Sequence, residues 1–116
     1  MKYFFSILCF FLFTPIVSAE LFITSVFPNT EDDAQQEYIE LYNSSSDIFS
    51  LSGYTLSDAS NKVYTFGSGA LLSSKIFTAF SRPETKILLN NTNETIFLKN
   101  PQGQVIDSIS YVSSIK

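Results

Sequence analysis

The sequence predicts an all-β domain, built as a sandwich or barrel of about eight short strands. After Glu20, runs rich in β-branched and aromatic residues alternate with turn residues at regular intervals. No window in this region sustains the period of an amphipathic helix. A length of 116 residues suits one domain and leaves little room for a second.

The start of the chain is typical of a signal peptide. Lys2 precedes an almost unbroken apolar run from Tyr3 to Phe13, and the small residues of Val17–Ala19 follow it. This run is shorter than the roughly 20 apolar residues that cross a bilayer, which argues against an uncleaved anchor. We expect residues 1–19 to be removed, leaving a domain over 20–116 that does not span a membrane. The mature form is expected to be secreted, periplasmic or at the cell surface.

The first half of the domain holds several predicted strands, separated by polar residues and by the turn at Ser52-Gly53. These strands are Leu21–Phe27, Glu37–Tyr42, two short runs within Ile48–Leu56, and Lys62–Phe66. In the second of them, Glu37 shares one face with Ile39 and Leu41, while Tyr38, Glu40 and Tyr42 share the other. The alternation predicts a strand with one buried face.

The second half repeats the pattern. Its predicted strands are Lys75–Phe80, Lys86–Leu89, Glu94–Lys99 and Gln104–Tyr111. The last two should form a hairpin, because Pro101 and Gly103 supply a tight turn between them. Asp107 lies in a strand that is otherwise apolar on its face, so we expect its carboxylate to accept hydrogen bonds from neighbouring groups. If Gln104–Tyr111 is an edge strand, it could also pair with a second copy of the chain.

Composition excludes several kinds of chemistry. The chain has no histidine, and its one cysteine is Cys9, inside the predicted signal peptide. A mature domain therefore has no disulfide, no thiolate metal site and no serine–histidine or cysteine nucleophile system. The whole chain has 7 basic and 11 acidic residues, a net charge of −4. Because binding to phosphate backbones requires clustered lysine and arginine, we expect no nucleic-acid partner.

Several segments, in this order, resemble the lamin tail domain family, whose fold is an immunoglobulin-like β-sandwich. They are Ile23–Asn29, Glu37–Leu41 with Asn43, Leu51–Asp58, Asn91–Leu98 and Gly103–Tyr111. Two positions depart from the usual family pattern: Tyr54 stands where tryptophan is common, and Ser44 stands where proline is common. The resemblance implies the fold but little about function, since bacterial members are exported and often occur beside nucleases, phosphatases or other surface modules.

The densest acidic segment is a candidate metal site. Glu31, Asp32 and Asp33 follow one another in a predicted loop and could supply several of the oxygens that calcium prefers. The alternative is an ordinary solvated loop, because the segment lacks the spacing and the central glycine of an EF-hand. Calcium is the one cofactor that the sequence suggests.

Tyrosines are the candidate partner-binding residues. Tyr38, Tyr42, Tyr54 and Tyr64 could share an outer face of the sandwich, and tyrosine is enriched where proteins recognise partners. The alternative is that these rings cover the packing between the sheets, as strand aromatics commonly do.

These observations favour a non-catalytic exported module that binds a protein or a cell-envelope component. No catalytic residue is predicted: Glu37 and Glu40 lie on opposite faces of one strand and cannot converge, and nothing activates the serines. Two alternatives are a calcium-dependent surface module and a self-assembling structural domain, and a cryptic hydrolase is a third.

Overall fold

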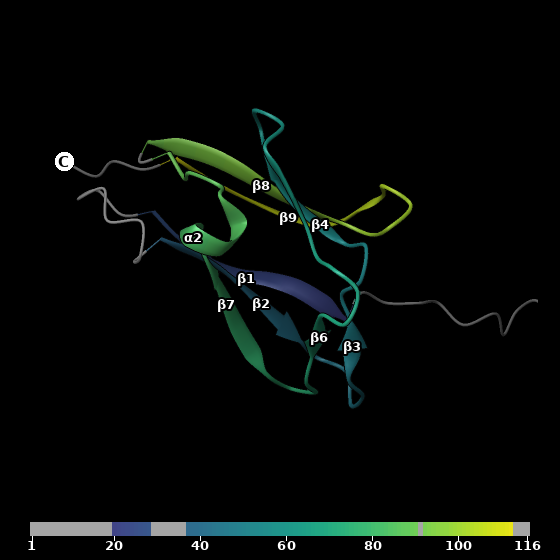
Figure 1. Cartoon of the computed structure of the whole chain (residues 1–116). Coiled ribbons are helices and arrows are strands. Elements are labelled where there is room, and N and C mark those ends of the chain that lie inside the picture. The colour runs from purple at the N-terminus through teal and green to yellow at the C-terminus, as the bar shows by residue number, and fades with distance from the viewer. Residues whose placement is uncertain (1–19, 29–36, 91, 113–116) are drawn as a thin grey trace, which may run out of the picture.

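The computed structural model describes residues 20–28, 37–90 and 92–112, which form nine short strands and one helical turn (Figure 1). The strands are β1 (Leu21–Phe27), β2 (Tyr38–Asn43), β3 (Phe49–Ser50), β4 (Thr55–Asp58), β5 (Val63–Thr65), β6 (Leu71–Leu72), β7 (Phe77–Ser81), β8 (Asn93–Lys99) and β9 (Val105–Val112). The helical turn, α2, spans Arg82–Thr85. Every strand pair is antiparallel, and the architecture agrees with the predicted all-β, immunoglobulin-like sandwich.

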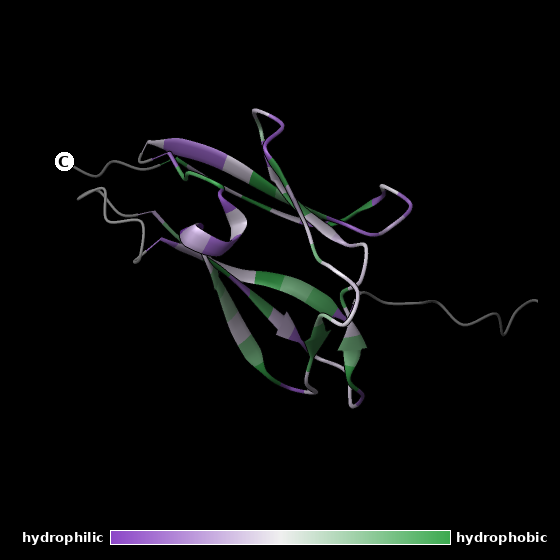
Figure 2. Cartoon of the chain, in the orientation of Figure 1, coloured by the Kyte–Doolittle hydropathy of each residue, from purple (hydrophilic) through white to green (hydrophobic). Residues whose placement is uncertain are grey.

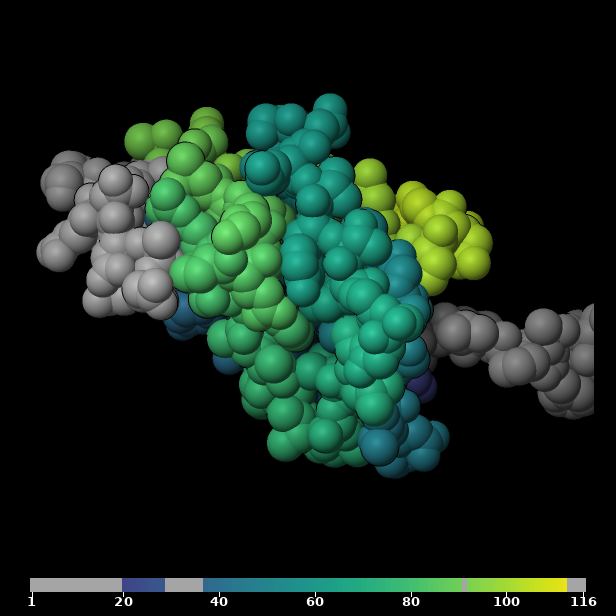
Figure 3. Space-filling model, viewed as in Figure 1, coloured from purple at the N-terminus to yellow at the C-terminus, as the bar shows by residue number. Residues whose placement is uncertain are grey.

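The strands form three sheets. A three-stranded sheet has the order β1-β2-β7, a four-stranded sheet has the order β5-β4-β8-β9, and β3 pairs with β6 in a small third sheet. The two larger sheets form the layers of the sandwich (Figure 1). Apolar residues concentrate along the strands, whereas the loop between β8 and β9 is hydrophilic (Figure 2) and projects from the body of the molecule (Figure 3).

The core lies between these layers and follows from the alternation of residues along the strands. Ile39 and Leu41 of β2 and Ile96 and Leu98 of β8 are all buried. The remaining buried apolar residues are Leu21, Ile23, Leu51, Leu56, Phe66, Leu72, Ile87 and Leu89. All of these core residues follow Glu20, so the segment from Glu20 onward contains all the described strands and the whole described core.

Glu37 shares the buried face of Ile39 and Leu41, as the alternation predicts, and it is only 1% exposed. Its carboxylate accepts a hydrogen bond from the Leu89 backbone N–H at 3.2 Å and lies 3.4 Å from Nη1 of Arg82. A buried carboxylate needs such partners, because an unpaired charge in the interior is strongly destabilising. Glu37 therefore anchors the segment after β7 onto β2.

Asp107 connects the two layers. Its Oδ2 accepts a hydrogen bond of 2.8 Å from the backbone N–H of Ile23 in β1, and its Oδ1 accepts one from Ser108. The prediction that this carboxylate has hydrogen-bond donors is confirmed. The Ile23 N–H points away from β2. The Asp107 side chain therefore accepts a hydrogen bond that a neighbouring strand would otherwise accept.

Asn43, the last residue of β2, also connects separate segments through its side chain. It is fully buried, and its amide nitrogen donates to the carbonyls of Asp47, Leu72 and Ser73. Its side-chain oxygen accepts from the N–H and hydroxyl of Ser45. One amide thus holds the β3 and β6 segments against the end of β2.

One predicted strand is wrong. Residues 86–89 form no strand; α2 ends at Thr85, and Lys86 adopts a left-handed conformation with φ of 64°. The predicting pattern is nevertheless real, because Ile87 and Leu89 are buried and Leu88 is exposed. An extended segment lying on a core shows this alternation without any partner strand.

Other boundaries differ from the prediction by a few residues. β7 begins at Phe77 and not at Lys75, because Lys75 has a positive φ of 58° that interrupts an extended chain. The two-residue strand β6 was not predicted from the sequence. The hairpin of β8 and β9 is confirmed, with Gly103 at a φ of 84° in its turn.

Candidate functional site

The outer face of the three-stranded sheet is the strongest candidate for a binding surface. In β1 and β2 the buried positions are those of the core, so the intervening residues project outward. Cross-strand register then places aromatic residues of three strands on one surface. This aromatic face consists of Phe22, Phe27, Tyr38, Tyr42 and Phe77.

One end of the aromatic face is a row across all three strands. Phe22 lies opposite Tyr42, and Tyr42 lies opposite Phe77. The rings of Tyr42 and Phe77 are stacked, with centroids 4.2 Å apart and an angle of 27° between their planes. Phe77 is nonetheless 57% exposed, a large apolar area to leave in water.

The other end of the aromatic face holds a second stacked pair. The centroids of Phe27 and Tyr38 are 5.4 Å apart, with an angle of 16° between the ring planes. Phe27 is among the exposed large apolar residues. Aromatic rings therefore flank this face at both ends of β2.

A row without aromatic residues, with Glu40 at its centre, separates the two aromatic ends. Glu40 lies between Tyr38 and Tyr42 on β2, and its Oε1 accepts a hydrogen bond of 2.9 Å from the hydroxyl of Thr24. Ala79 lies opposite Glu40 on β7 and is exposed. The surface thus combines apolar area with one negative charge near its centre.

The structure brings together two of the four predicted tyrosines. Tyr38 and Tyr42 lie on the aromatic face, whereas Tyr54 and Tyr64 pack against the core from other strands and loops. Tyr54 makes an edge-on contact with Phe49. The four do not share one outer face, because Tyr64 belongs to the four-stranded sheet.

Tyr64 also links the two layers at the side opposite Asp107. Its hydroxyl donates a hydrogen bond of 3.1 Å to Oε2 of Glu84 in α2. Burial raises the pKa of Tyr64, and the hydrogen bond and negative charge of Glu84 raise it further. Phe66, at the end of the same segment, meets Phe80 of β7 edge-on.

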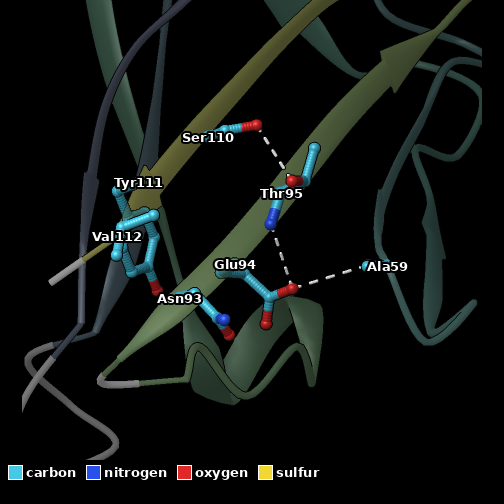
Figure 4. Close-up of a pocket in the computed structure, with 7 residues that line it drawn as sticks. All are labelled: Ala59, Asn93, Glu94, Thr95, Ser110, Tyr111 and Val112. Carbon is cyan, nitrogen blue, oxygen red and sulfur yellow. Dashed lines mark hydrogen bonds between the residues drawn. The ribbon is translucent and has the colours of Figure 1, made fainter.

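A pocket of about 360 Å³ lies where the start of β8 meets the end of β9 (Figure 4). Its lining residues are Ala59, Asn93, Glu94, Thr95, Ser110, Tyr111 and Val112. Glu94 is 8% exposed, and its carboxylate accepts from the backbone N–H groups of Ala59, Asn90 and Thr95 at 3.2 to 3.5 Å. These are long hydrogen bonds for a buried carboxylate.

The hydroxyl groups of this pocket are occupied by other contacts. Thr95 and Ser110 share a hydrogen bond of 2.9 Å (Figure 4), and the hydroxyl of Tyr111 donates to the carbonyl of Asn90. Burial raises the pKa of Tyr111 to about 12, with further contributions from the negative charges of Glu94 and Glu37. A nucleophilic hydroxyl requires an adjacent base, and within the described residues no hydroxyl bonds to Glu94.

A neighbouring pocket of about 290 Å³ shares Glu94 and includes Asp58. Oδ1 of Asp58 accepts three hydrogen bonds of 2.9 Å, from the N–H and hydroxyl of Ser60 and the N–H of Lys62. These bonds define the turn between β4 and β5, which gives Asp58 a structural role.

The predicted metal ligands Glu31, Asp32 and Asp33 lie outside the described residues. Within the parts of the chain that the structure does describe, no group of three or more histidine, cysteine, aspartate or glutamate residues could hold a metal ion. The calcium hypothesis therefore stays a prediction.

The predicted signal peptide, residues 1–19, also lies outside the described residues. Within residues 20–28, 37–90 and 92–112, no helix has the length and apolar character needed to cross a membrane.

Sequence reasoning missed the phenylalanines of the aromatic face. Phe22 and Phe77 belong to it because of their register with Tyr42. The signal for Phe22 was available: Leu21 and Ile23 flank it, and a strand with those two inward must project Phe22 outward.

The layers, the register and the inter-layer contacts define an immunoglobulin-like β-sandwich domain. The sequence matches the Lamin Tail Domain family over residues 14–113. The chain therefore belongs to this family, as its motifs suggested, and the family is generally a non-catalytic module. A search of curated proteins finds no match.

Proposed function

We propose that this protein is a non-catalytic exported module that binds a protein partner through its aromatic face. The observation that carries the proposal is the stacked pair of Tyr42 and Phe77, in which Phe77 is 57% exposed beside the other outward-facing rings of the same sheet. Exposed aromatic side chains gathered on one face of a small domain commonly mark an interaction surface. Aromatic residues are enriched at the centres of such interfaces.

The ring geometry favours a protein over a sugar as the partner. A sugar ring stacks on the open face of an aromatic side chain, whereas Tyr42 and Phe77 already cover one face of each other at 4.2 Å. Phe27 and Tyr38 are stacked in the same way. Rings that stand side by side present edges and grooves, which suit insertion of apolar side chains from a protein.

The charge of the aromatic face indicates what the partner carries. Glu40 is the central charge, and its carboxylate contacts the Thr24 hydroxyl. The chain as a whole has a net charge of −4. A partner with an apolar patch and a lysine or arginine opposite Glu40 complements this surface, and the charge pair would assist orientation more than affinity.

Export and the lack of catalysis are parts of the same proposal. The leader of residues 1–19 supports export, and the absence of histidine from the chain supports a binding role. Membership of a generally non-catalytic family supports it further.

The test is capture of partners by the immobilised segment Glu20–Lys116 from exported and envelope proteins of its own cell. We expect one specific partner, and an affinity at least about tenfold weaker for Phe77→Ala, which removes a central aromatic anchor. Val105→Ala is the matched control, because Val105 is 52% exposed on the other sheet. Equal loss in both variants, or none in Phe77→Ala, contradicts the proposed surface.

The same capture experiment distinguishes binding by the aromatic face from calcium-dependent binding. Retention that requires calcium and is lost in a variant with Glu31, Asp32 and Asp33 replaced by their amides would assign binding to that segment. Retention that survives chelation and depends on Phe77 supports the aromatic face.

A further inference from the structure

The outermost strands of the two larger sheets differ in how well their edges are protected. An unprotected edge is a template for pairing with another strand, and proteins usually blunt such edges. On β1, the outward N–H of Ile23 is bonded to the side chain of Asp107, and β9, the outermost strand of the other sheet, lies beside β1. β5 has only the three residues of Val63–Thr65. Among the described residues, β7 has no such protection.

The backbone groups of β7 that point outward can be assigned from its register with β2. The N–H of Arg82 donates to the carbonyl of Glu37, and the N–H of Asn43 donates to the carbonyl of Ile76. Because hydrogen-bonded residues alternate along an antiparallel strand, the groups facing β2 are those of the even-numbered residues. The N–H and C=O groups of Phe77, Ala79 and Ser81 therefore point away from the sheet.

Within the part of the chain that the structure describes, side chains and neighbouring strands leave this edge open. The sequence of β7 is FTAFS, with no lysine, no proline and no other charge to oppose pairing. Phe77 and Ala79 are exposed. β7 forms the lower left border of the molecule, and no other described strand lies beyond it in this view (Figures 1 and 3).

We propose that β7 pairs with β7 of a second copy of this chain, antiparallel across a twofold axis at Ala79. In that register Ala79 faces its own counterpart, and Phe77 faces Ser81 of the other copy. All the outward residues are odd-numbered, so each meets another outward residue and exchanges a pair of hydrogen bonds with it. The edge is thus complementary to itself, as a twofold interface requires.

Size and charge are compatible with this arrangement. Ala79 is small enough to sit on the axis without a clash. Glu40 lies one strand inward, so the two Glu40 carboxylates would be about three strand spacings apart, roughly 14 Å. This exceeds the Debye length of about 8 Å at physiological salt, so their repulsion is largely screened.

Pairing would join the two aromatic faces into one surface on a six-stranded sheet, because Phe77 of one copy would lie beside Ser81 of the other, which pairs with Tyr38. The inference concerns the edge of the sheet and not its face. It stands or falls independently of any partner bound there, because its readout is the oligomeric state of the purified protein.

Sedimentation equilibrium of Glu20–Lys116 tests the inference. We expect a concentration-dependent dimer with a dissociation constant below about 0.1 mM, the range of weak but specific association. Ala79→Lys should weaken the dimer about tenfold or more, because it places like charges opposite each other on the axis. An equimolar mixture of Ala79→Lys and Ala79→Asp should restore dimers, since each axis then carries opposite charges.

The controls make the result specific. Val63→Lys introduces the same charge on the edge strand of the other sheet and should leave the dimer unchanged. Ala79 is exposed, so its variants should retain the circular dichroism spectrum of the parent. A monomer at all concentrations, a dimer indifferent to Ala79→Lys, or a mixture that fails to dimerise overturns the proposal.

Discussion

Asp107 and Asn43 are polar residues whose side chains connect segments that share no strand ladder. Asp107 of β9 accepts from Ile23 of β1, and Asn43 of β2 donates to the carbonyls of Leu72 and Ser73. In each case the side chain forms a hydrogen bond with a backbone group that lies outside the strand ladders. Buried backbone groups without partners are costly, so these contacts constrain how the layers sit together.

Replacing Asp107 should therefore weaken the sandwich. We expect Asp107→Ala to lower the free energy of unfolding by about 1–3 kcal/mol, because it leaves the Ile23 N–H without its charged acceptor. Asp107→Asn should cost less, since its amide oxygen can still accept. Urea denaturation measures both. Asp47→Ala is the control, because Asp47 is exposed and makes its hydrogen bonds through its backbone. A loss no larger for Asp107→Ala than for Asp47→Ala would refute this role.

Tyr111 should give the protein an alkaline stability limit. Its pKa of about 12 in the folded state lies above the ordinary value of tyrosine, about 10, so folding favours the neutral phenol. Its contribution to stability is fully present below about pH 10 and is lost as the pH rises from about 10 to 12. Denaturation at a series of pH values should show a smaller alkaline loss for Tyr111→Phe. Parallel curves for both proteins would show that Tyr111 does not carry the effect.

At the scale of elements, two turn glycines have different surroundings. Gly53 and Gly103 have φ values of 81° and 84°, a region that costs other residues about 1–2 kcal/mol. A Cβ at Gly53 would meet Cγ of Pro101 at 3.2 Å, whereas one at Gly103 would meet nothing within 4 Å. Gly53→Ala should therefore be the more destabilising substitution in thermal or urea unfolding. The reverse order would mean that contact with Pro101 does not constrain this corner.

The sequence predicts those elements whose pattern is local. β1 and the hairpin of β8 and β9 were predicted because runs of strand-forming residues are bounded there by turn residues, and a Pro–Gly turn joins the hairpin. β6 was missed because two residues, Leu71 and Leu72, become a strand only through pairing with β3. Residues 86–89 were predicted as a strand because alternate burial does not reveal whether a partner strand is present.

The candidate site was predictable to the same extent. Alternation along β2 places Tyr38 and Tyr42 on one face, and the structure agrees. That Phe77 lies against Tyr42 depends on the register between β2 and β7, which are far apart in the chain. The local sequence pattern does not determine that register. It also does not determine that Tyr54 and Tyr64 pack against the core.

At the scale of the whole molecule, the two surfaces proposed for association use different chemistry. The aromatic face offers side chains, whereas the edge of β7 offers backbone groups. If both operate, a dimer presents two aromatic faces side by side, and a partner with repeated binding sites gains avidity from the pair.

The most direct test of this account is amide hydrogen exchange of the domain, alone and in complex with the partner that it captures. We expect added protection in β2 and β7, over Tyr38–Asn43 and Phe77–Ser81, with β8 and β9 unchanged. Protection confined to β8, β9 and the pocket around Glu94 would contradict it and would move the binding site to the opposite sheet.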